Sequence, residues 1–318
     1  MTDGRLFVKR DDLTSSLYGG NKIRKFEHLF ADARRRDADV LITVGGVGSN
    51  QALAATLHGK ALGFTVELSL AAQPLTGGAL RNLRGMLAAG AVIRYAPSGF
   101  GSMLGAYAAV RDRRRSGGRP YYIPLGATNP LGTAGYVAAG LELAEQIAQG
   151  EMPVPDCVFV AAGTSGTAAG LAVGFRIAGL STRIVAVSTF GPQWVNRVAL
   201  QWHARRVATL LARLDRQVPR VHVAWNDVEL IHDFVAPGYG IPTPQAEFAL
   251  AWAAPALRLE TTYTGRALAA CLAWCRTHGA GRTVLFWNTY NSTAFPIADH
   301  WGGVPDALRV LIEFNALA

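Results

Sequence analysis

Cysteine is scarce in this sequence. Three of its 318 residues are cysteines, namely Cys157, Cys271 and Cys275. No two of them are separated by two residues, and none has the Cys/His spacing of a zinc site. A chain of this length with so few cysteines is also unlike a disulfide-stapled secreted domain. We therefore expect a reduced, cytoplasmic protein without a metal site.

Several signatures of common enzyme and targeting classes are absent as well. The sequence has no HExxH metalloprotease helix, no GxSxG hydrolase elbow, no P-loop and no GxGxxG dinucleotide fingerprint. Its seven histidines lack metal-ligand spacing. Residues 1–5 carry no hydrophobic segment of the kind that directs secretion. These absences exclude the motif-defined hydrolases, P-loop enzymes and dinucleotide enzymes as simple explanations.

Charged residues make up only 17% of the chain, and their balance is positive, at +9. Arginines cluster within residues 34–36 and 111–115, at the ends of helix-like segments, where they complement the helix dipole and stay solvated. No nucleic-acid-binding motif accompanies them, so we expect no nucleic-acid partner. The uncharged run over residues 157–175 is long enough to cross a membrane, but the Gly-rich residues 163–167 at its centre favour a strand, a turn and a helix.

Half of the residues are hydrophobic, and short apolar strands alternate with amphipathic helices along the chain. This alternation predicts an α/β fold with mainly parallel sheets and helices on both faces. In such sheets, ligands bind where strands end and helices begin. The expected strands cover residues 6–9, 40–44, 65–70, 92–95, 121–123, 157–162, 183–187 and 283–287. The expected helices include residues 22–35, 51–62, 103–114, 133–149, 167–178 and 265–277.

The first turn of interest is Gly19-Gly20-Asn21-Lys22. Apolar residues recur at helical spacing after it, so the pattern predicts a helix that begins at Lys22, with Asn21 as its N-cap. A lysine in the first turn opposes the helix dipole, which favours the neutral amine. A neutral amine is the form that makes a Schiff base with an aldehyde cofactor. A surface lysine at a helix start would give the same local pattern.

The second turn lies between an apolar strand and an Ala/Gly-rich helix, and consists of Gly163, Thr164, Ser165, Gly166 and Thr167. Glycines let the backbone approach an oxyanion, while hydroxyls and helix N-terminal amides donate hydrogen bonds to it. This pattern predicts a cradle for a mononucleotide or a small phosphorylated cofactor. A tight turn with small packing residues is the alternative.

The third turn, residues 45–51, is also Gly-rich and also joins a strand to a helix. Its backbone amides are suited to a second anion, such as a substrate carboxylate. Close helix–strand packing would explain the glycines equally well.

Taken together and in this order, the three turns resemble the D-cysteine desulfhydrase and 1-aminocyclopropane-1-carboxylate deaminase family. Its members are pyridoxal-phosphate-dependent enzymes with the tryptophan synthase β-like fold. The similarity spans nearly the whole chain, which makes it specific for the fold and the cofactor. The matching stretches are residues 8–13, 19–25, 43–51, 129–132, 135–136, 163–174, 236–242 and 263–266, with Thr289 at a strand end.

The resemblance implies an α/β chain of two open, mainly parallel-sheet domains with the active site in the cleft between them. Residues 1–18 and 133–318 would form the large cofactor-binding domain, whose N-terminal part is shorter than the family's usual one. Residues 19–132 would form the small domain. The family also implies a homodimer, a small amino acid as substrate and pyridoxal 5′-phosphate as cofactor.

By the same resemblance, Lys22 would form the Schiff base with the cofactor, and Asn50 would hydrogen-bond its 3′-oxygen. Thr289 would face the pyridine nitrogen, where a hydroxyl does not force protonation. A weaker electron sink of this kind suits elimination better than transamination. The residues implied to hold the phosphate are Gly163, Thr164, Ser165, Gly166 and Thr167.

The resemblance also assigns the substrate side of the site. Ser49, Asn50 and Gln51 would receive the substrate carboxylate. Tyr239 and Tyr263 would flank the reacting carbon as packing and acid/base groups. The catalytic residues implied are therefore Lys22, Tyr263, Tyr239 and Ser49.

Two positions favour the desulfhydrase branch of the family. The ring-opening deaminase branch typically has an acidic residue after the active-site tyrosine and leucine at the strand end, whereas this sequence has Thr264 and Thr289. Gln51 points the other way, because the desulfhydrase branch usually has histidine there. The strand end also departs from the family's usual His-Thr-Gly-Gly and reads Asn288-Thr289-Tyr290-Asn291. Tyr290 would reshape the substrate pocket.

The sequence thus predicts a lyase that catalyses α,β-elimination from a small amino acid, such as D-cysteine, to a 2-oxo acid and ammonia. Ring-opening deamination of 1-aminocyclopropane-1-carboxylate and a biosynthetic β-replacement on the same scaffold remain alternatives. The altered strand end leaves open a hypothesis of another class, a cofactor-binding protein that has lost catalysis.

Overall fold

The computed structural model describes residues 5–317 of the chain. They form two compact units. Unit 1 consists of residues 5–15, 19–28 and 126–292, and unit 2 consists of residues 16–18, 29–125 and 293–317. Each unit contains one parallel sheet with helices packed against it.

Unit 1 is built on a five-stranded parallel sheet with the order β1-β9-β6-β7-β8. The strands are β1 (Arg5–Arg10), β6 (Cys157–Ala162), β7 (Arg183–Ser188), β8 (Val228–Ile231) and β9 (Thr283–Asn288). The helices are the 3-10 turn η1 (Asp11–Leu13), α5 (Pro130–Ala148), α6 (Gly166–Ala178), α7 (Arg197–Leu214), α8 (Pro244–Ala253) and α9 (Thr264–His278).

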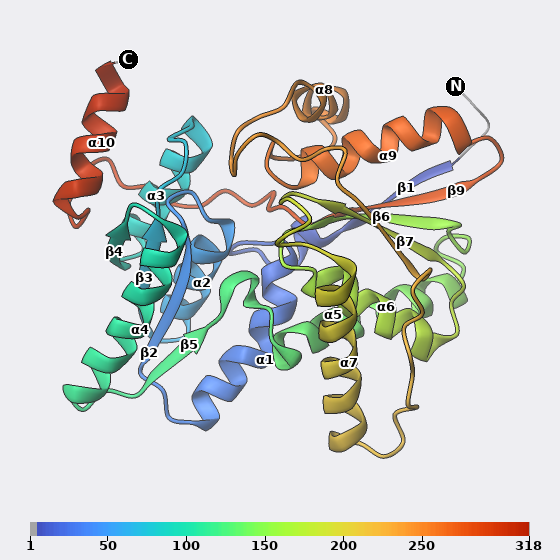
Figure 1. Cartoon of the computed structure of the whole chain (residues 1–318), viewed down its shortest axis with the longest axis horizontal. Coiled ribbons are helices and arrows are strands. Elements are labelled where there is room, and N and C mark those ends of the chain that lie inside the picture. Colours follow the sequence, from blue (N-terminus) through green and yellow to red (C-terminus); the bar gives the residue numbers. More distant parts are fainter. Residues whose placement is uncertain (1–4, 318) are drawn as a thin grey trace. The chain divides into compact units, whose positions relative to one another are not determined.

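The strands of unit 1 bury alternate side chains on opposite faces of the sheet. On β6, Val158 and Val160 belong to the core formed with α5, α6 and α7, whereas Phe159 belongs to the core formed with α8 and α9. Figure 1 shows these two groups of helices on opposite sides of the sheet. Both faces are therefore covered, which explains why β6 is apolar at every position.

Unit 2 is built on a four-stranded parallel sheet with the order β4-β3-β2-β5. The strands are β2 (Val40–Gly46), β3 (Thr65–Ala71), β4 (Val92–Ala96) and β5 (Pro120–Ile123). The helices are α2 (Asn50–Ala61), α3 (Gly77–Ala88), α4 (Gly99–Arg115) and α10 (Asp306–Leu317); α1 (Asn21–Arg35) and the 3-10 turn η2 (Leu125–Ala127) each have residues in both units.

Opposite faces of the unit 2 sheet pack against different helices. Ile42 and Val44 form a small core with Ala106 and Ala109 of α4. Leu41 points to the other face, towards α2. A Cβ added at Gly59 of this helix would lie 2.9 Å from the Leu41 side chain. Alternation along β2 thus fixes which helix covers which face.

Side-chain caps mark where most of these helices begin. Asn129 caps α5 by accepting from the Gly132 amide at 2.7 Å, with Pro130 in the first turn, and Asn196 caps α7 by accepting from the Ala199 amide at 2.9 Å. The exceptions include α6 and α9, whose starting residues make no side-chain cap bond. Those two helix starts lie at turns that carry the predicted site.

The strands predicted from sequence are all present, within one or two residues at each end. One further strand, β8, is short and was not predicted. The helices α3, α7, α8 and α10 were not among those named, and α1 begins at Asn21, so this residue lies inside the helix rather than before it. Helix α4 begins at Gly99, four residues earlier than expected. Within residues 5–317, no helix combines the length and apolar character needed to span a membrane.

Candidate active site

The turn between β6 and α6 has the geometry of an anion cradle. Ser165 adopts the left-handed conformation, with φ of 59°, which is uncommon for a residue other than glycine. Helix α6 begins at the next residue without a side-chain cap, so its first amides keep their donors free of side-chain partners. The Ser165 hydroxyl is buried and has no hydrogen-bond partner within the described part of the chain. Strain and an unpartnered buried donor together fit a turn built around an oxyanion.

At two glycines of this turn, neighbouring atoms leave little room for a side chain. A Cβ added at Gly166 would lie 2.6 Å from the Thr128 hydroxyl oxygen and 3.0 Å from the Lys25 ammonium nitrogen. A Cβ added at Gly163 would lie 3.0 Å from the ring of Tyr263. The turn therefore brings the sequence-predicted phosphate residues beside Lys25 on one side and Tyr263 on the other.

Lys25 is a part of this site that the sequence interpretation did not single out. It is 1% exposed, and its ammonium donates to the Gly126 carbonyl at 3.1 Å and to the Thr128 hydroxyl at 3.3 Å. Thr128 in turn lies 2.6 Å, oxygen to oxygen, from the Thr164 hydroxyl. Among the ion pairs of residues 5–317, none includes Lys25. A buried lysine amine without a carboxylate is a suitable partner for a phosphate, because the phosphate charge would favour the ammonium form.

The environment of Lys25 perturbs its acidity. Burial lowers the pKa of Lys25 well below the ordinary lysine value, and the nearby charge of Lys22 lowers it further. The sequence offers one indication of Lys25, which is its spacing from Lys22. A residue three positions after Lys22 lies on the same side of the helix.

Lys22 lies in the first turn of α1, as the sequence predicts. Burial lowers the pKa of Lys22 to about 8, which increases the share of neutral amine at neutral pH. Backbone hydrogen bonds fix the turn that precedes Lys22. The Gly20 amide donates to the Asp11 carbonyl at 2.7 Å, and the Asn21 amide donates to the Thr289 carbonyl at 3.1 Å.

Glycine is required at position 20 for two reasons. Its φ is 99°, in the region that favours glycine, and an added Cβ would lie 2.6 Å from the Tyr290 carbonyl oxygen. The Lys22 turn is therefore packed directly on the end of β9.

A buried ionic cluster anchors the start of α1 within unit 1. Arg24 pairs with Asp11 at 2.8 Å and with Glu142 of α5 at 2.7 Å. Asp11 is fully buried and also accepts a 2.5 Å hydrogen bond from Tyr136. The neighbouring Gly135 allows close packing, because an added Cβ would lie 1.9 Å from the Arg24 carbonyl oxygen. These contacts fix the start of α1, from which Lys22 and Lys25 project.

Tyr239 and Tyr263 form a hydrogen-bonded pair. The Tyr263 hydroxyl donates to the Tyr239 hydroxyl at 3.0 Å, and the Tyr239 ring stacks on Phe190 with centroids 5.3 Å apart. Burial raises the pKa of both phenols, so both keep their protons at neutral pH. The structure brings these two predicted residues together and sets Tyr263 against Gly163.

Glu260 orients Tyr263, a role that the sequence interpretation did not assign. Its carboxylate accepts from the amides of Thr262, Tyr263 and Thr264, each at 2.8 Å. Because this carboxylate caps the start of α9, the backbone at Tyr263 is fixed even though Tyr263 itself makes no cap bond. An acidic residue four positions before the first residue of a helix was the available signal.

Thr289 and Tyr290 follow the last residue of β9. Thr289 is 8% exposed, and its carbonyl accepts the Asn21 amide. Tyr290 is half-buried, and its amide donates to the Asn288 side chain at 3.3 Å. The contacts described place the Tyr290 backbone against Gly20, so the predicted substrate role of its ring stays a prediction.

The remaining predicted residues lie at the start of α2 in unit 2. Ser49 caps this helix by accepting from the Ala52 amide at 3.2 Å, which leaves its own hydroxyl proton to donate. The Gln51 side-chain amide donates to Thr43 at 2.8 Å and to the Pro124 carbonyl at 3.0 Å, so its hydrogens are committed within unit 2. A carboxylate would therefore have the first-turn backbone amides of α2, not the Gln51 side chain, as donors.

Asn82 of α3 is a further residue that sequence reasoning missed. Its side-chain amide donates to the Asn50 side-chain oxygen at 2.8 Å and to the Gly48 carbonyl at 2.9 Å. With its oxygen occupied, Asn50 presents its own amide hydrogens as donors. This fits the predicted hydrogen bond to a cofactor oxygen.

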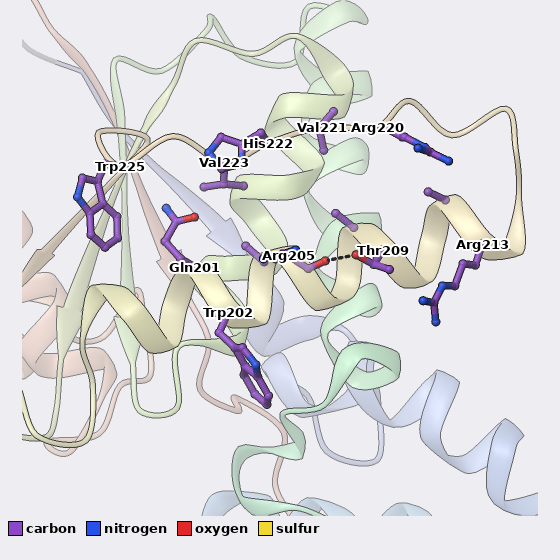
Figure 2. A pocket seen from close by; sticks show the side chains of 13 residues that line it. Gln201, Trp202, Arg205, Thr209, Arg213, Arg220, Val221, His222, Val223 and Trp225 are labelled. Carbon is purple, nitrogen blue, oxygen red and sulfur yellow. Dashed lines mark hydrogen bonds between the residues drawn. The ribbon is translucent and has the colours of Figure 1, made fainter.

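A groove of about 900 Å³ in unit 1 lies away from these residues, between α7 and residues 220–225 (Figure 2). None of the predicted site residues lines it. Its arginines, such as Arg205 and Arg213, are exposed, and Figure 2 shows Arg213 at one end of the groove and Trp225 at the other. We regard it as solvated surface rather than part of the site.

Comparisons with known proteins show which chains this one is similar to. The chain is 36% identical over 289 residues to a putative 1-aminocyclopropane-1-carboxylate deaminase of Pyrococcus furiosus, covering 89% of this chain and 84% of the relative. It is 34% identical to the nocardicin C-9′ epimerase of Nocardia uniformis, covering 97% and 92%. It is 35% identical to a D-cysteine desulfhydrase of Salmonella paratyphi C, covering 83% and 79%.

A solved structure supports the fold at full length. The crystal structure of a homologue of 1-aminocyclopropane-1-carboxylate deaminase matches with a TM-score of 0.78 and 30% sequence identity, over 99% of this chain and 89% of that one. This confirms the predicted fold class, α/β with two parallel sheets of the tryptophan synthase β-like type.

The family itself is shown by a model that spans almost the whole sequence. The model described as pyridoxal-phosphate dependent enzyme matches residues 1–308. The turn at residues 163–167, the buried Lys25 and the half-buried Lys22 fit the phosphate and the aldehyde of that cofactor. The chain therefore belongs to the pyridoxal-phosphate-dependent enzyme family and shares its cofactor, pyridoxal 5′-phosphate.

Proposed function

We propose that this protein is a lyase that eliminates a β leaving group from a small amino acid, D-cysteine or a close relative, and yields a 2-oxo acid and ammonia. The observation that carries the proposal is the pair of half-buried phenols, 3.0 Å apart, packed beside the phosphate turn through Tyr263 and Gly163. Elimination needs a base for the α-proton and a proton for the departing group, and unit 1 contains candidates for both.

The cofactor, when bound, supplies an electron sink for the charge that develops at the α-carbon. In our proposal residues 163–167 and Lys25 hold its phosphate, and Lys22 holds its aldehyde carbon. Thr289 stands at the end of β9, where its hydroxyl would face the ring nitrogen. Asn50, oriented by Asn82, would donate to the 3′-oxygen.

Lys22 is the proposed base. With a pKa of about 8, roughly one tenth of its amine is neutral at pH 7, whereas an ordinary lysine would be neutral in only about three molecules in ten thousand. In its neutral form this amine can accept the α-proton of a bound substrate. Its ε-nitrogen then holds that proton until solvent removes it.

Tyr239 is the proposed proton donor to the leaving sulfur. Tyr263 donates to Tyr239, so the proton of Tyr239 itself remains free of that bond. The raised pKa of Tyr239 keeps this proton in place at neutral pH. A departing thiolate can take it, and solvent can restore it.

The surroundings of Tyr263 favour elimination over ring opening. Both oxygens of Glu260 accept backbone amides at the start of α9, so this carboxylate serves as a helix cap. The Thr264 hydroxyl accepts the Glu260 amide at 3.0 Å. The position after the tyrosine thus carries a hydroxyl used for local structure, in place of the acid typical of the ring-opening branch.

On the substrate side, we propose that Ser49 and the backbone amides of Asn50 and Gln51 receive the substrate carboxylate. The Ser49 hydroxyl proton is the side-chain donor available for this. Tyr290 is proposed to limit the size of the substrate side chain. Both assignments are testable by steady-state kinetics of Ser49→Ala and Tyr290→Gly, which should raise KM more than they lower kcat.

The direct test is product analysis of the purified holoenzyme. Incubation with D-cysteine should release sulfide, pyruvate and ammonia in equal amounts, and Lys22→Ala should abolish this release. L-Cysteine and 1-aminocyclopropane-1-carboxylate serve as parallel substrates. Release of 2-oxobutanoate from the latter, without sulfide from D-cysteine, would replace our proposal with ring-opening deamination.

Epimerisation at the α-carbon is a second candidate, favoured by the 34% identity to nocardicin C-9′ epimerase over 97% of this chain. Both reactions begin with removal of the α-proton, and they differ in whether a β-group then leaves. Chiral chromatography of an amino acid without a leaving group, such as D-alanine in deuterium oxide, separates them. Formation of the L-enantiomer with deuterium at the α-carbon would favour the epimerase.

A further inference from the structure

We propose that Asn291 is a positioning residue for Lys22, acting through the backbone of the turn that precedes the lysine. This inference rests on the proposed role of Lys22 as the lysine that binds the cofactor. Asn291 itself is assigned no contact with cofactor or substrate.

The contact is a buried hydrogen bond between distant parts of the chain. The Asn291 side-chain oxygen accepts from the Gly19 amide at 2.7 Å, and Asn291 is 2% exposed. The bond joins the segment after β9 to the glycine pair that leads into α1. A buried amide that loses its acceptor must find another or rotate, because leaving it unpaired is unfavourable.

Three consecutive amides before Lys22 are held in this way. Gly19 donates to Asn291, Gly20 to the Asp11 carbonyl at 2.7 Å, and Asn21 to the Thr289 carbonyl at 3.1 Å. The acceptors for Gly20 and Asn21 are backbone carbonyls, which no substitution removes. The acceptor for Gly19 depends on the Asn291 side chain.

The bond between Gly19 and Asn291 matters because two glycines follow one another in this turn. Gly19 and Gly20 lack side chains, so their peptide groups can rotate more easily than those of other residues. Lys22 follows only two residues after Gly20, so a rotation there would move the base of its side chain relative to the phosphate turn. Asn291 removes that freedom.

Hydrogen bonds of the next residue, Ser292, anchor the segment that carries Asn291. The Ser292 amide donates to the Asp12 carbonyl at 3.3 Å, and the Ser292 hydroxyl also donates to the Asp12 carboxylate. Asn291 stands where the resembling family commonly has glycine, which could not make this bond. The inference therefore concerns a feature of this chain in particular.

The test is covalent trapping of pyridoxal phosphate on Lys22 by borohydride, followed by peptide mapping. For Asn291→Ala, the trapping rate at about pH 9.5, which lies above the pKa of about 8 of Lys22 in the wild-type chain, should fall about tenfold or more. Asn291→Asp keeps an acceptor oxygen at the same place and should recover the rate to within about threefold of wild type. Asn291→Ser, too short to reach Gly19, should behave like the alanine variant and provides a second reading if Asn291→Ala does not fold.

Asn196→Ala is the matched control. It removes another asparagine acceptor from a backbone amide of unit 1, at the start of α7, and should leave the trapping rate unchanged. Wild-type trapping rates in Asn291→Ala and Asn291→Ser would overturn the positioning role and leave the proposed function intact. Label absent from Lys22 in the wild-type protein would contradict the proposed function and, with it, this role.

Discussion

At the scale of single residues, the site is defined by two lysines on one helical turn. Lys22 and Lys25 lie three residues apart near the start of α1, and burial lowers the pKa of both. The two have different surroundings, because Lys25 lies against Gly166 and Thr128 near the phosphate turn. We assign the Schiff base to Lys22 and the counter-charge to Lys25.

The first prediction concerns pH. Because the pKa of Lys22 is lowered to about 8, the neutral amine increases up to that pH and then levels off. The rate of borohydride trapping of pyridoxal phosphate on Lys22 should therefore rise about tenfold per pH unit below pH 8 and become flat above it. A rate that still climbs steeply at pH 10 would mean that Lys22 is an ordinary solvated lysine.

The second prediction separates Lys25 from Lys22. Lys25→Met should weaken binding of pyridoxal phosphate by about tenfold to a hundredfold, because a charge-assisted hydrogen bond to the phosphate is lost. Binding of pyridoxal, which has no phosphate, should change little. Equilibrium dialysis measures both constants, and the exposed Lys60→Met serves as control. Equal weakening for both ligands would contradict a phosphate role.

The sequence could predict Lys22, the phosphate turn and the two tyrosines because each lies at a strand–helix turn or at a motif of the family. For Lys25 and Glu260 it offers only a spacing, and for Asn82 no signal, since their roles depend on partners brought close only by folding. Lys25 becomes significant once Gly166 is seen beside it, and Asn82 once its amide is seen to reach Asn50. Residues that act through another residue leave little local pattern.

At the scale of helices and strands, several of the predicted site residues lie at the starts of helices. Most helices begin after ordinary side-chain caps, whereas α6 follows the strained Ser165, and α9 follows Tyr263 with a carboxylate supplied from Glu260. Strands were predicted well because buried parallel strands are short, continuous apolar runs. The short β8 and helices with a weak apolar stripe, such as α8, lack such a pattern.

The third prediction tests the α9 start. Glu260→Gln replaces a charged acceptor of three amides and should lower the free energy of unfolding by about 1–2 kcal/mol. Because Tyr263 lies in this cap, kcat should fall by a larger factor than KM rises. Chemical denaturation and steady-state kinetics measure the two effects, with the exposed Glu151→Gln as control. Unchanged stability and kcat would show that the cap bonds do not matter.

At the scale of the whole molecule, the sequence predicts a homodimer through its resemblance to the family, and this stays a prediction. Unit 1 exposes several large aromatic side chains, which is a property of surfaces that meet a partner. They are Trp194, Trp202, Trp225, Phe248 and Trp252.

The fourth prediction is therefore a solution mass. Light scattering of the holoenzyme after size exclusion should give twice the chain mass of 33.9 kDa. Phe248→Glu together with Trp252→Glu, both exposed on α8, should shift the population towards monomer, because each would place a charge in the expected apolar contact. A monomeric mass for the wild-type holoenzyme at micromolar concentration would contradict the expected dimer.

The central claim, that Lys22 carries the cofactor, is tested most directly by one measurement. The purified protein is saturated with pyridoxal 5′-phosphate, its visible absorbance is recorded, and the sample is reduced with borohydride and mapped by mass spectrometry. We predict a visible band that borohydride removes and a single reduced adduct on Lys22, absent from Lys22→Ala. A protein that stays colourless with added cofactor, or an adduct on Lys25 in place of Lys22, would contradict this account.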